Sequence, residues 1–209
     1  MRPLKKQSQQ QSVSLPRARG TGTVRIIAGQ WRRTPLNVTH LDGLRPTGDR
    51  VRETLFNWLS HFWGDFSEIE GLDLFAGSGA LGFELASRGS KKVILVEKNR
   101  NAYKALCAVR DKLHAQEVIE IRLADALSEL AKINKQFDII FIDPPFALNL
   151  HEKAIKEALL YLKEGGYLYI ESPKEWDAKI LSDLKLDVVR QSDAGAVTFR
   201  LVSKQRDLI

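Results

Sequence analysis

The sequence predicts a doubly wound α/β fold: a mostly parallel sheet with a C-terminal antiparallel hairpin and a small N-terminal β-hairpin extension. Apolar runs of strand length alternate with segments whose apolar residues recur at helical spacing, from residue 71 to residue 184. The first run closes in the glycine turn, residues 76–79 (Ala-Gly-Ser-Gly), which feeds a helix. Carboxylates stand at or near the ends of four runs, where such sheets bind ligands.

Composition is that of a globular protein. The 209 residues are 44% hydrophobic and 28% charged, and they contain neither a run long enough to cross a bilayer nor the apolar core of a secretory signal. The single cysteine, Cys107, excludes an internal disulfide, and the four histidines lack zinc-ligand spacing. We therefore expect a cytoplasmic protein without membrane association or a metal, and we expect a monomer.

The net charge of +6 is concentrated at the N-terminus. Residues 1–41 carry eight basic and no acidic side chains, which leaves 24 basic and 26 acidic side chains in the rest. This asymmetry favours a polyanionic partner such as nucleic acid, and a solubilising tail is the alternative. Residues 1–22 are rich in Gln and Ser and poor in apolar residues, which predicts a disordered basic arm.

Residues 23–48 predict an RNA-binding hairpin followed by a loop. Two β-prone runs, residues 23–27 and 35–38, flank an exposed tip that holds Trp31, Arg32 and Arg33. An aromatic ring beside two guanidinium groups suits stacking on unpaired bases and pairing with phosphates. A structural Trp31 that covers the hairpin is the alternative.

A helix follows the loop of residues 44–50, with Thr47 or Asp49 as its cap. Its core-facing residues recur at helical spacing: Val51, Leu55, Trp58, Leu59 and Phe62. Arg45, Arg50 and Arg52 crowd the start of this helix, where positive charge opposes the helix dipole. We interpret the segment as a hinge that contacts both substrate and cofactor, with a solvated loop as the alternative.

Strands and helices alternate beyond this helix. The predicted strands cover residues 72–75, 93–97, 118–123, 137–142 and 167–171. The predicted helices begin after Gly79 and cover residues 100–113, 126–133, 151–162 and 176–184. Two last runs, residues 186–190 and 197–202, predict a hairpin joined by Ser192-Asp193-Ala194-Gly195.

The glycine turn predicts a nucleoside-cofactor site. A strand, a turn and a helix N-terminus bring backbone N–H groups and the positive end of the helix dipole to one point. Asp73 is a carboxylate inside an apolar strand, which is unfavourable without a partner, and Glu97 closes the next strand, where it can accept a ribose hydroxyl. An ordinary strand–helix turn is the alternative. A nicotinamide-dependent oxidoreductase also fits residues 77–82, although Asp73 would place a negative charge near the pyrophosphate.

The segment Asp143-Pro144-Pro145-Phe146, the acceptor lip, predicts where a substrate base binds. Two prolines rigidify the turn, so the Asp143 carboxylate and the Pro144 carbonyl form a fixed row of acceptors beside the Phe146 ring. A base with an exocyclic amine would stack on Phe146 and donate both amine protons to these acceptors. Its nitrogen would then face an electrophile while the developing positive charge is stabilised. A structural turn with a buried Phe146 is the alternative.

These motifs resemble known enzymes. Residues 73–79, Glu97, Asp125 and the acceptor lip are similar to S-adenosylmethionine-dependent methyltransferases that act on amines. Residues 44–59 and 25–29 resemble more specifically the RsmD family, bacterial methyltransferases acting on guanine N2 of 16S ribosomal RNA. The likeness runs from about residue 24 to residue 202. It implies a Rossmann-like methyltransferase domain over residues 49–209, S-adenosylmethionine as cofactor, and 16S rRNA of the small ribosomal subunit as partner.

The resemblance also implies roles for individual residues. Gly77 and Gly79 would pack against the methionine part of the cofactor, with Asp73 near its amino group and Glu97 on its ribose. Asp125 with Ala126 would hold the adenine. The implied cofactor-binding residues are Thr47, Arg50, Asp73, Phe75, Ala76, Gly77, Ser78, Gly79, Glu97, Lys98, Asp125, Ala126 and Asp143. The implied catalytic residues are Asp143, Pro144, Pro145 and Phe146. The RNA-binding residues that we expect are Arg25, Trp31, Arg32, Arg33, Arg45 and Arg52.

Other functions fit parts of the pattern. The acceptor lip alone does not separate guanine N2 from adenine N6 in DNA or RNA, so an adenine methyltransferase is a second reading. Carbon methylation of pyrimidines needs a cysteine nucleophile, and Cys107 lies in the middle of a predicted helix. A non-enzymatic RNA-binding module would leave the carboxylates at the sheet edge unexplained.

The arm before Thr23 is longer than the usual start of the family, and its composition predicts no part in the core. Deletion of residues 1–21 should therefore leave the fold intact. The thermal midpoint of the shortened protein, followed by circular dichroism, should match that of the full chain. A large fall in that midpoint would contradict the prediction of a disordered arm.

Overall fold

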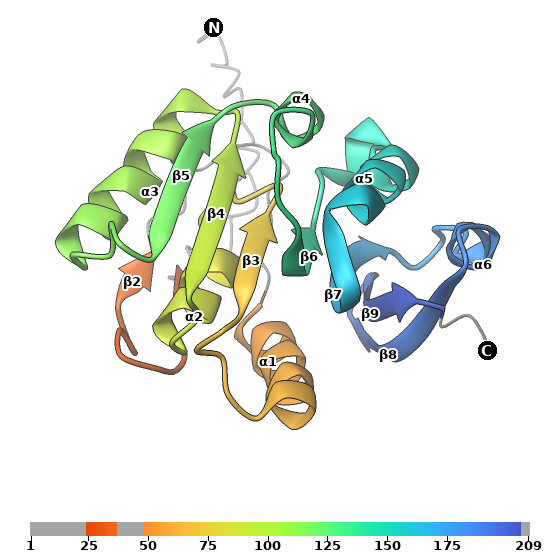
Figure 1. The fold of residues 1–209 in the computed structure, drawn as a ribbon, viewed down its shortest axis with the longest axis horizontal. Coiled ribbons are helices and arrows are strands. Elements are labelled where there is room, and N and C mark those ends of the chain that lie inside the picture. Colours follow the sequence, from red (N-terminus) through yellow and green to blue (C-terminus); the bar gives the residue numbers. More distant parts are fainter. Residues whose placement is uncertain (1–23, 37–47, 206–209) are drawn as a thin grey trace, which may run out of the picture.

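A computed structural model describes residues 24–36 and 48–205 as helices on both faces of one sheet, with a small hairpin beside them (Figure 1). The strands are β1 (Val24–Arg25), β2 (Pro35–Leu36), β3 (Glu70–Asp73), β4 (Lys92–Glu97), β5 (Ile119–Leu123), β6 (Phe137–Ile142), β7 (Leu162–Pro173), β8 (Leu186–Ala194) and β9 (Val197–Lys204). The helices are α1 (Asp49–Trp63), α2 (Ala80–Ser87), α3 (Arg100–Lys112), α4 (Ala126–Leu130), α5 (His151–Ala158) and α6 (Lys179–Asp183), with short 3-10 turns η1 (Phe146–Leu148) and η2 (Leu159–Tyr161).

The main sheet has seven strands in the order β5-β4-β3-β6-β7-β9-β8. Strands β3 to β7 are parallel, whereas β9 pairs antiparallel with both β7 and β8. Strands β1 and β2 form a separate antiparallel hairpin. The predicted fold, a mostly parallel Rossmann-like sheet with a hairpin at each end, is confirmed. The predicted arm, residues 1–22, lies outside the described residues.

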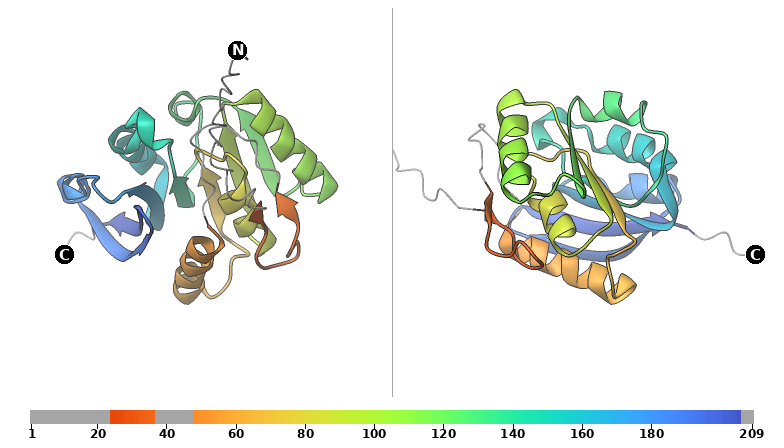
Figure 2. Two further views of the ribbon diagram at one scale, coloured as in Figure 1. Left: turned by 180° about the vertical axis from the view of Figure 1, so that it is seen from behind. Right: turned by 60° about the vertical axis from the view of Figure 1, so that its left-hand side comes forward.

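Each face of the sheet has its own hydrophobic core. Helices α1, α2 and α3 cover one face together with the hairpin, and α4, α5 and α6 cover the other (Figure 2). Side chains alternate along β6, so that Ile139 and Phe141 enter the first core whereas Ile140 and Ile142 enter the second. All four are fully buried, which explains why residues 139–142 of this strand form a continuous apolar run.

The boundaries of α5 and β7 differ from the prediction. The helix ends at Ala158 and a 12-residue strand begins at Leu162, whereas we expected a helix to residue 162 and a strand from residue 167. Two glycines make the early start possible. Gly165 has a φ of 72°, and a Cβ on Gly166 would lie 3.0 Å from the Asp138 carbonyl oxygen.

Three other boundaries also moved. The C-terminal hairpin turns at residues 195–196, because Ser192 and Asp193 belong to β8 and pair with β9. Helix α6 starts at Lys179, whose N–H donates to the Asp177 carboxylate. Gly48 is the N-cap of α1 and Asp49 its first residue, so the prediction of Asp49 as the cap is wrong. Thr47, the other predicted cap, lies outside the described residues.

The N-terminal hairpin is fixed to the C-terminal part of α2 by a buried carboxylate. The Ile27 N–H donates to Glu84 Oε2 at 2.7 Å and the Ala28 N–H donates to Glu84 Oε1 at 3.1 Å. Ser87 Oγ accepts from the Trp31 N–H at 3.0 Å and donates to the Ala28 carbonyl at 2.6 Å. Since charge-assisted hydrogen bonds are stronger than neutral ones, Glu84 anchors a hairpin whose own strands are only two residues long.

Glu84 also holds two arginines. Arg88 Nε donates to Glu84 Oε1 at 2.8 Å, and Arg52 Nη1 lies 3.7 Å from Glu84 Oε2. The Arg52 side chain is fully buried, and its Nη2 donates to Asp49 at 2.6 Å, while Nε and Nη1 have no hydrogen-bond partner among the described residues. Removal of the Glu84 carboxylate would thus leave a buried guanidinium and two backbone N–H groups without this partner.

Glu84→Ala should therefore lower the free energy of unfolding by about 3–5 kcal/mol, the range for one lost partner of a buried ion pair. Chemical denaturation measures this change. Glu120→Ala is the matched control: it breaks the ion pair of a partly exposed carboxylate with Arg122 and should change stability by less than about 1 kcal/mol. Equal effects of the two substitutions would contradict the anchoring role of Glu84.

Candidate functional site

Asp73 ends β3 and is buried, with 3% of its surface exposed. Its Oδ2 accepts from the Gly82 N–H at 3.2 Å, and the Phe75 N–H also bonds to its carboxylate. Burial raises the pKa of Asp73 to about 7, an effect that these two hydrogen bonds oppose and that the nearby Glu97 charge adds to. No salt bridge to Asp73 occurs within residues 24–36 and 48–205. The site therefore presents a buried carboxylate that a cationic group would stabilise.

Glu97 ends the neighbouring strand β4 and joins it to the glycine turn. Its Oε2 accepts from the Gly77 N–H at 2.8 Å and its Oε1 accepts from the Asn99 N–H at 2.7 Å. Gly77 has a φ of 53°, and a Cβ there would have only the Phe75 carbonyl within 4 Å, so the space beside it is open. Each carboxylate oxygen of Glu97 retains a lone pair for a second donor such as a sugar hydroxyl.

The glycine turn has no free space at Gly79, in contrast to the open space beside Gly77. Gly79 is the N-cap of α2 with a φ of 77°, and a Cβ there would lie 2.5 Å from the Phe83 ring. Ala76 is buried, while Phe75 and Ser78 are half-buried. The turn thus packs against the core on one side and leaves room on the other.

The predicted adenine-binding residues follow β5, the strand beyond β4. Asp125 is exposed and caps α4, accepting from the N–H groups of Leu127 and Ser128 at 3.2 Å. Ala126, the first residue of α4, is buried, and Lys98, just after β4, is exposed. The carboxylates at residues 73, 97, 125 and 143 thus lie at or just beyond the carboxyl ends of four adjacent parallel strands, at one edge of the sheet.

The acceptor lip follows β6, and β6 is the other neighbour of β3. Asp73 is paired with Phe141, so Asp143 comes two residues beyond the level of Asp73. Pro144 is buried, and the Leu148 N–H donates to the Pro145 carbonyl rather than to that of Pro144. Phe146 is 37% exposed, which is not the buried ring of a purely structural turn.

A polar cluster behind the lip was missed by the sequence reasoning. Tyr169 is fully buried and its hydroxyl donates to Glu171 Oε1 at 2.7 Å. Burial, followed by the negative charges of Glu171 and Asp143, raises the pKa of Tyr169 well above its usual value. His151 packs between the rings of Phe146 and Trp176, and its Nε2 lies 2.8 Å from the Glu171 carbonyl oxygen. Glu171 in an apolar strand was the available signal, but only the pairing of β6 with β7 reveals its neighbours.

The residues expected to bind RNA differ in their exposure to solvent. Arg25, Arg32 and Arg33 are exposed, as predicted for such contacts. Trp31 is half-buried and packs against the core on the α1–α2 face, the arrangement of the structural alternative. For Arg52 the prediction is wrong, because its side chain is fully buried and paired with Asp49 and Glu84.

The hinge residues are described only in part. Arg50 is exposed in the first turn of α1. Arg45 and Thr47 lie outside the described residues.

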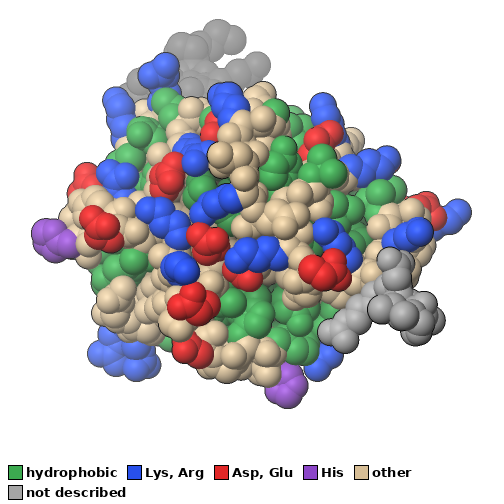
Figure 3. Space-filling model, in the orientation of Figure 1, with side chains coloured by type: hydrophobic (Ala, Val, Ile, Leu, Met, Phe, Trp, Pro, Cys, Tyr) green, Lys and Arg blue, Asp and Glu red, His purple; other side chains and the backbone are tan. Residues whose placement is uncertain are grey.

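The surface seen in Figure 3 carries Lys and Arg side chains interspersed with Asp and Glu, in keeping with the near balance of charge beyond residue 41.

The chain is similar in sequence to a family of known proteins. A family model described as "Conserved hypothetical protein 95" matches residues 24–203. The chain belongs to this family. A family relative from Haemophilus influenzae, "Ribosomal RNA small subunit methyltransferase D", is 40% identical over 90% of this chain and 97% of its own length. A relative with the same name from Escherichia coli strain K12 is 38% identical over 91% of this chain and 94% of its own length. The resemblance to the RsmD family is thereby confirmed.

Solved structures extend the likeness to the fold of the family. The Escherichia coli protein yhhF has a TM-score of 0.74 and 34% identity, over 88% of this chain and 99% of that one. A Methanocaldococcus jannaschii structure named as a tRNA m1G37 methyltransferase has a TM-score of 0.61 but 18% identity, over 78% of this chain and 51% of that one. The second likeness is one of fold alone.

Two absences apply to the described part of the chain. No helix there is long and apolar enough to cross a membrane. Within the same residues, no group of three or more His, Cys, Asp or Glu side chains is arranged to hold a metal ion.

The raised pKa of Asp73 predicts how stability depends on pH. The folded state holds the Asp73 proton up to about pH 7 and the unfolded state only to about 3.8, so this group makes the free energy of unfolding fall as pH rises between these values. Asp73→Asn should remove the effect and stabilise the free protein at pH 8 by roughly 2–4 kcal/mol, with little gain at pH 4. Urea denaturation at both pH values measures the difference.

Asp65→Asn is the contrasting control. Asp65 is exposed, and the Ser67 N–H and hydroxyl lower the pKa of its carboxyl, so its contribution is present at neutral pH and lost on acidification. The substitution should give no gain in stability at pH 8. The assignment to Asp73 would be contradicted if Asp73→Asn did not raise the free energy of unfolding at pH 8. It would also be contradicted if both variants raised it equally.

Proposed function

We propose that this protein transfers a methyl group from S-adenosylmethionine to the exocyclic N2 amine of a guanine in 16S ribosomal RNA. The observation that carries the proposal is the pairing of β3 with β6, which sets the glycine turn and the acceptor lip side by side. Ligands of doubly wound folds bind at such a point, where the strand order reverses. The names of relatives that are 38–40% identical over nine tenths of this chain support the choice of ribosomal RNA of the small subunit.

The residues at this edge fit the cofactor. Asp73 is a buried carboxylate suited to the cationic amino group of the methionine part, which would favour its ionised form. The open side of Gly77 offers room for the backbone of the methionine part, and Glu97 is held beside it in position for ribose hydroxyls. Asp125 and Ala126 would hold the adenine, and Lys98, directly after β4, would also contact the cofactor. When bound, the cofactor supplies an electrophilic methyl group on a sulfonium.

The acceptor lip would orient the amine that is methylated. An exocyclic amine is a poor nucleophile because its lone pair is delocalised into the ring. The Asp143 carboxylate and the Pro144 carbonyl would accept hydrogen bonds from its two N–H groups. These bonds turn the nitrogen lone pair towards the methyl group and stabilise the positive charge that develops. The half-exposed Phe146 ring offers the stacking face, and its contact with His151 limits its rotation. Asp143 would then take the proton that the methylated nitrogen must lose.

Residues outside this edge would guide the RNA and close the site. Arg50, together with Thr47 and Arg45, is proposed to act as the hinge between substrate and cofactor. Arg25, Arg32 and Arg33 would pair with phosphates. We propose that the protein works as a monomer in the cytoplasm, where ribosomal subunits are assembled.

Base mapping tests this function directly. The protein is incubated with labelled S-adenosylmethionine and small ribosomal subunits that lack the modification, and the labelled nucleoside is identified by mass spectrometry. N2-methylguanosine in 16S rRNA is the expected product. N6-methyladenosine would support the second reading, an adenine methyltransferase, since the acceptor lip suits either amine. Absence of any labelled nucleoside would contradict the proposal.

Asp143→Ala should reduce methyl transfer by at least about 100-fold, because it removes one of the two groups that orient the amine. Cofactor binding, measured by calorimetry, should survive. The matched control is Asp183→Ala, which removes an exposed carboxylate at the end of α6 and should leave turnover near that of the unmodified protein. Near-normal turnover of Asp143→Ala would remove this residue from the mechanism.

A further inference from the structure

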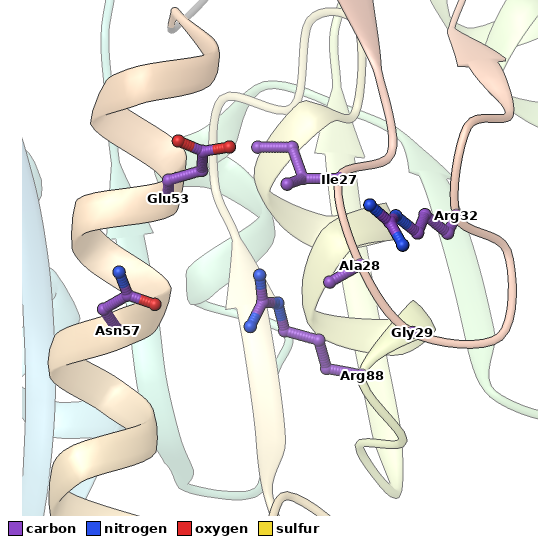
Figure 4. A pocket seen from close by; sticks show the side chains of 7 residues that line it. All are labelled: Ile27, Ala28, Gly29, Arg32, Glu53, Asn57 and Arg88. Carbon is purple, nitrogen blue, oxygen red and sulfur yellow. The ribbon is translucent and has the colours of Figure 1, made fainter.

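A surface cavity lies away from the proposed methylation site. It has a volume of about 590 Å³, opens to the surface, and lies between the hairpin tip, one side of α1 and the C-terminal end of α2 (Figure 4). Its lining residues are Ile27, Ala28, Gly29, Arg32, Glu53, Asn57 and Arg88. Ligand cavities in proteins span about 300–1,000 Å³, so this one is large enough for a nucleotide.

The hairpin wall of this cavity is fixed in place. Glu84 and Ser87 hold the backbone of Ile27 and Ala28, and the Gln30 N–H donates to the Ser87 carbonyl at 2.8 Å. Gly29 has a φ of 81°, and a Cβ there would lie 1.8 Å from the Ser87 carbonyl oxygen. The close approach of hairpin and helix therefore depends on glycine, and the cavity exists before any ligand arrives.

Polar side chains from all three elements point into the cavity. Arg88 is oriented by its ion pair with Glu84 and lies 4.8 Å above the Phe56 ring. Glu53 and Asn57 are exposed one turn apart on α1, and Figure 4 shows both directed towards the hairpin. Within the described part of the chain, the side chains of Arg32, Glu53 and Asn57 make no hydrogen bond or ion pair. These groups are available to a ligand.

We propose that this cavity binds one nucleotide of the RNA substrate, at a position other than the methylated guanine. Two guanidinium groups, on Arg32 and Arg88, match a phosphate. The Glu53 carboxylate and the Asn57 amide supply an acceptor and a mixed donor–acceptor edge, which match the polar edge of a base. Glu53 would repel the several carboxylates of an acidic peptide, whereas a nucleotide brings one phosphate for the arginines and an uncharged base edge for Glu53 and Asn57.

The position of the cavity suits a neighbouring part of the same RNA. Helix α2 begins at the glycine turn and ends at Ser87 beside the cavity, so the two sites are about 12 Å apart along its eight residues. That separation is greater than the distance from a base to its own phosphate, so the methylated nucleotide cannot fill both sites. A nearby nucleotide of the same RNA can occupy the cavity. The inference rests on the proposed function for the identity of the RNA, but its test does not require methyl transfer.

The test compares filter binding of a 16S ribosomal RNA transcript by three variants of the full chain. Arg32→Ala removes a phosphate contact and should weaken binding about tenfold and lower the salt slope by about one. Asn57→Trp fills the cavity from an exposed helix position and should also weaken binding about tenfold, with an unchanged thermal midpoint. Guanosine 5′-monophosphate should compete weakly with the transcript on the unmodified protein and not on Asn57→Trp.

Lys179→Ala is the control, because Lys179 is exposed at the start of α6, on the other face of the sheet from the hairpin, and does not line the cavity. It removes the same charge and should weaken binding less than threefold, through long-range attraction alone. Equal effects of Arg32→Ala and Lys179→Ala, with Asn57→Trp neutral, would overturn the proposal in favour of diffuse attraction. Weakened binding to assembled subunits with unchanged transcript binding would overturn it in favour of a protein partner. Failure of the unmodified protein to methylate rRNA would instead contradict the proposed function, and the transcript comparison would still decide on the cavity.

Discussion

The parallel pairing of β3 with β6 is the constraint on which the site depends. Asp73 lies opposite Phe141 in this pair, so the glycine turn and the acceptor lip leave neighbouring strands at the same edge. Because β4 lies on the other side of β3, Glu97 reaches the glycine turn through its bond to the Gly77 N–H. The glycine turn and the acceptor lip, whose nearest residues Gly79 and Asp143 are 64 positions apart in the sequence, thus meet at the ends of two neighbouring strands.

A buried carboxylate, that of Glu84, holds the N-terminal hairpin against α2. Glu84 concentrates two backbone N–H groups and two guanidinium groups at the end of α2. It thereby ties a hairpin too small to be stable alone to a helix whose other end carries the glycine turn. One helix consequently links the proposed cofactor site with the surface on which RNA is proposed to bind.

Much of the architecture could be predicted because it follows from local periodicity. Strand β6 is an apolar run that must be buried on both faces, and the residues after it are fixed by two prolines. The bounds of β7 were wrong because Gly165 and Gly166 read as a turn, whereas they permit a bulged start of the strand beside Asp138. Arg52 was assigned to RNA because charge alone does not say which face of a helix it occupies. Burial of a charged side chain depends on a partner, and Glu84 is 32 positions away in the chain.

The sequence by itself determined the strand–helix alternation, the glycine turn and the Asp-Pro-Pro-Phe turn, because these depend on residue type and short spacing. The same motifs carried the resemblance to the family. Only the tertiary structure decided which strands are neighbours, that Tyr169 and Glu171 stand behind Asp143, and that Arg32 shares a cavity with Arg88. These relations are contacts between distant segments. They are set by how the two faces of the sheet are covered and by which buried charges find partners, and neither can be read from local pattern.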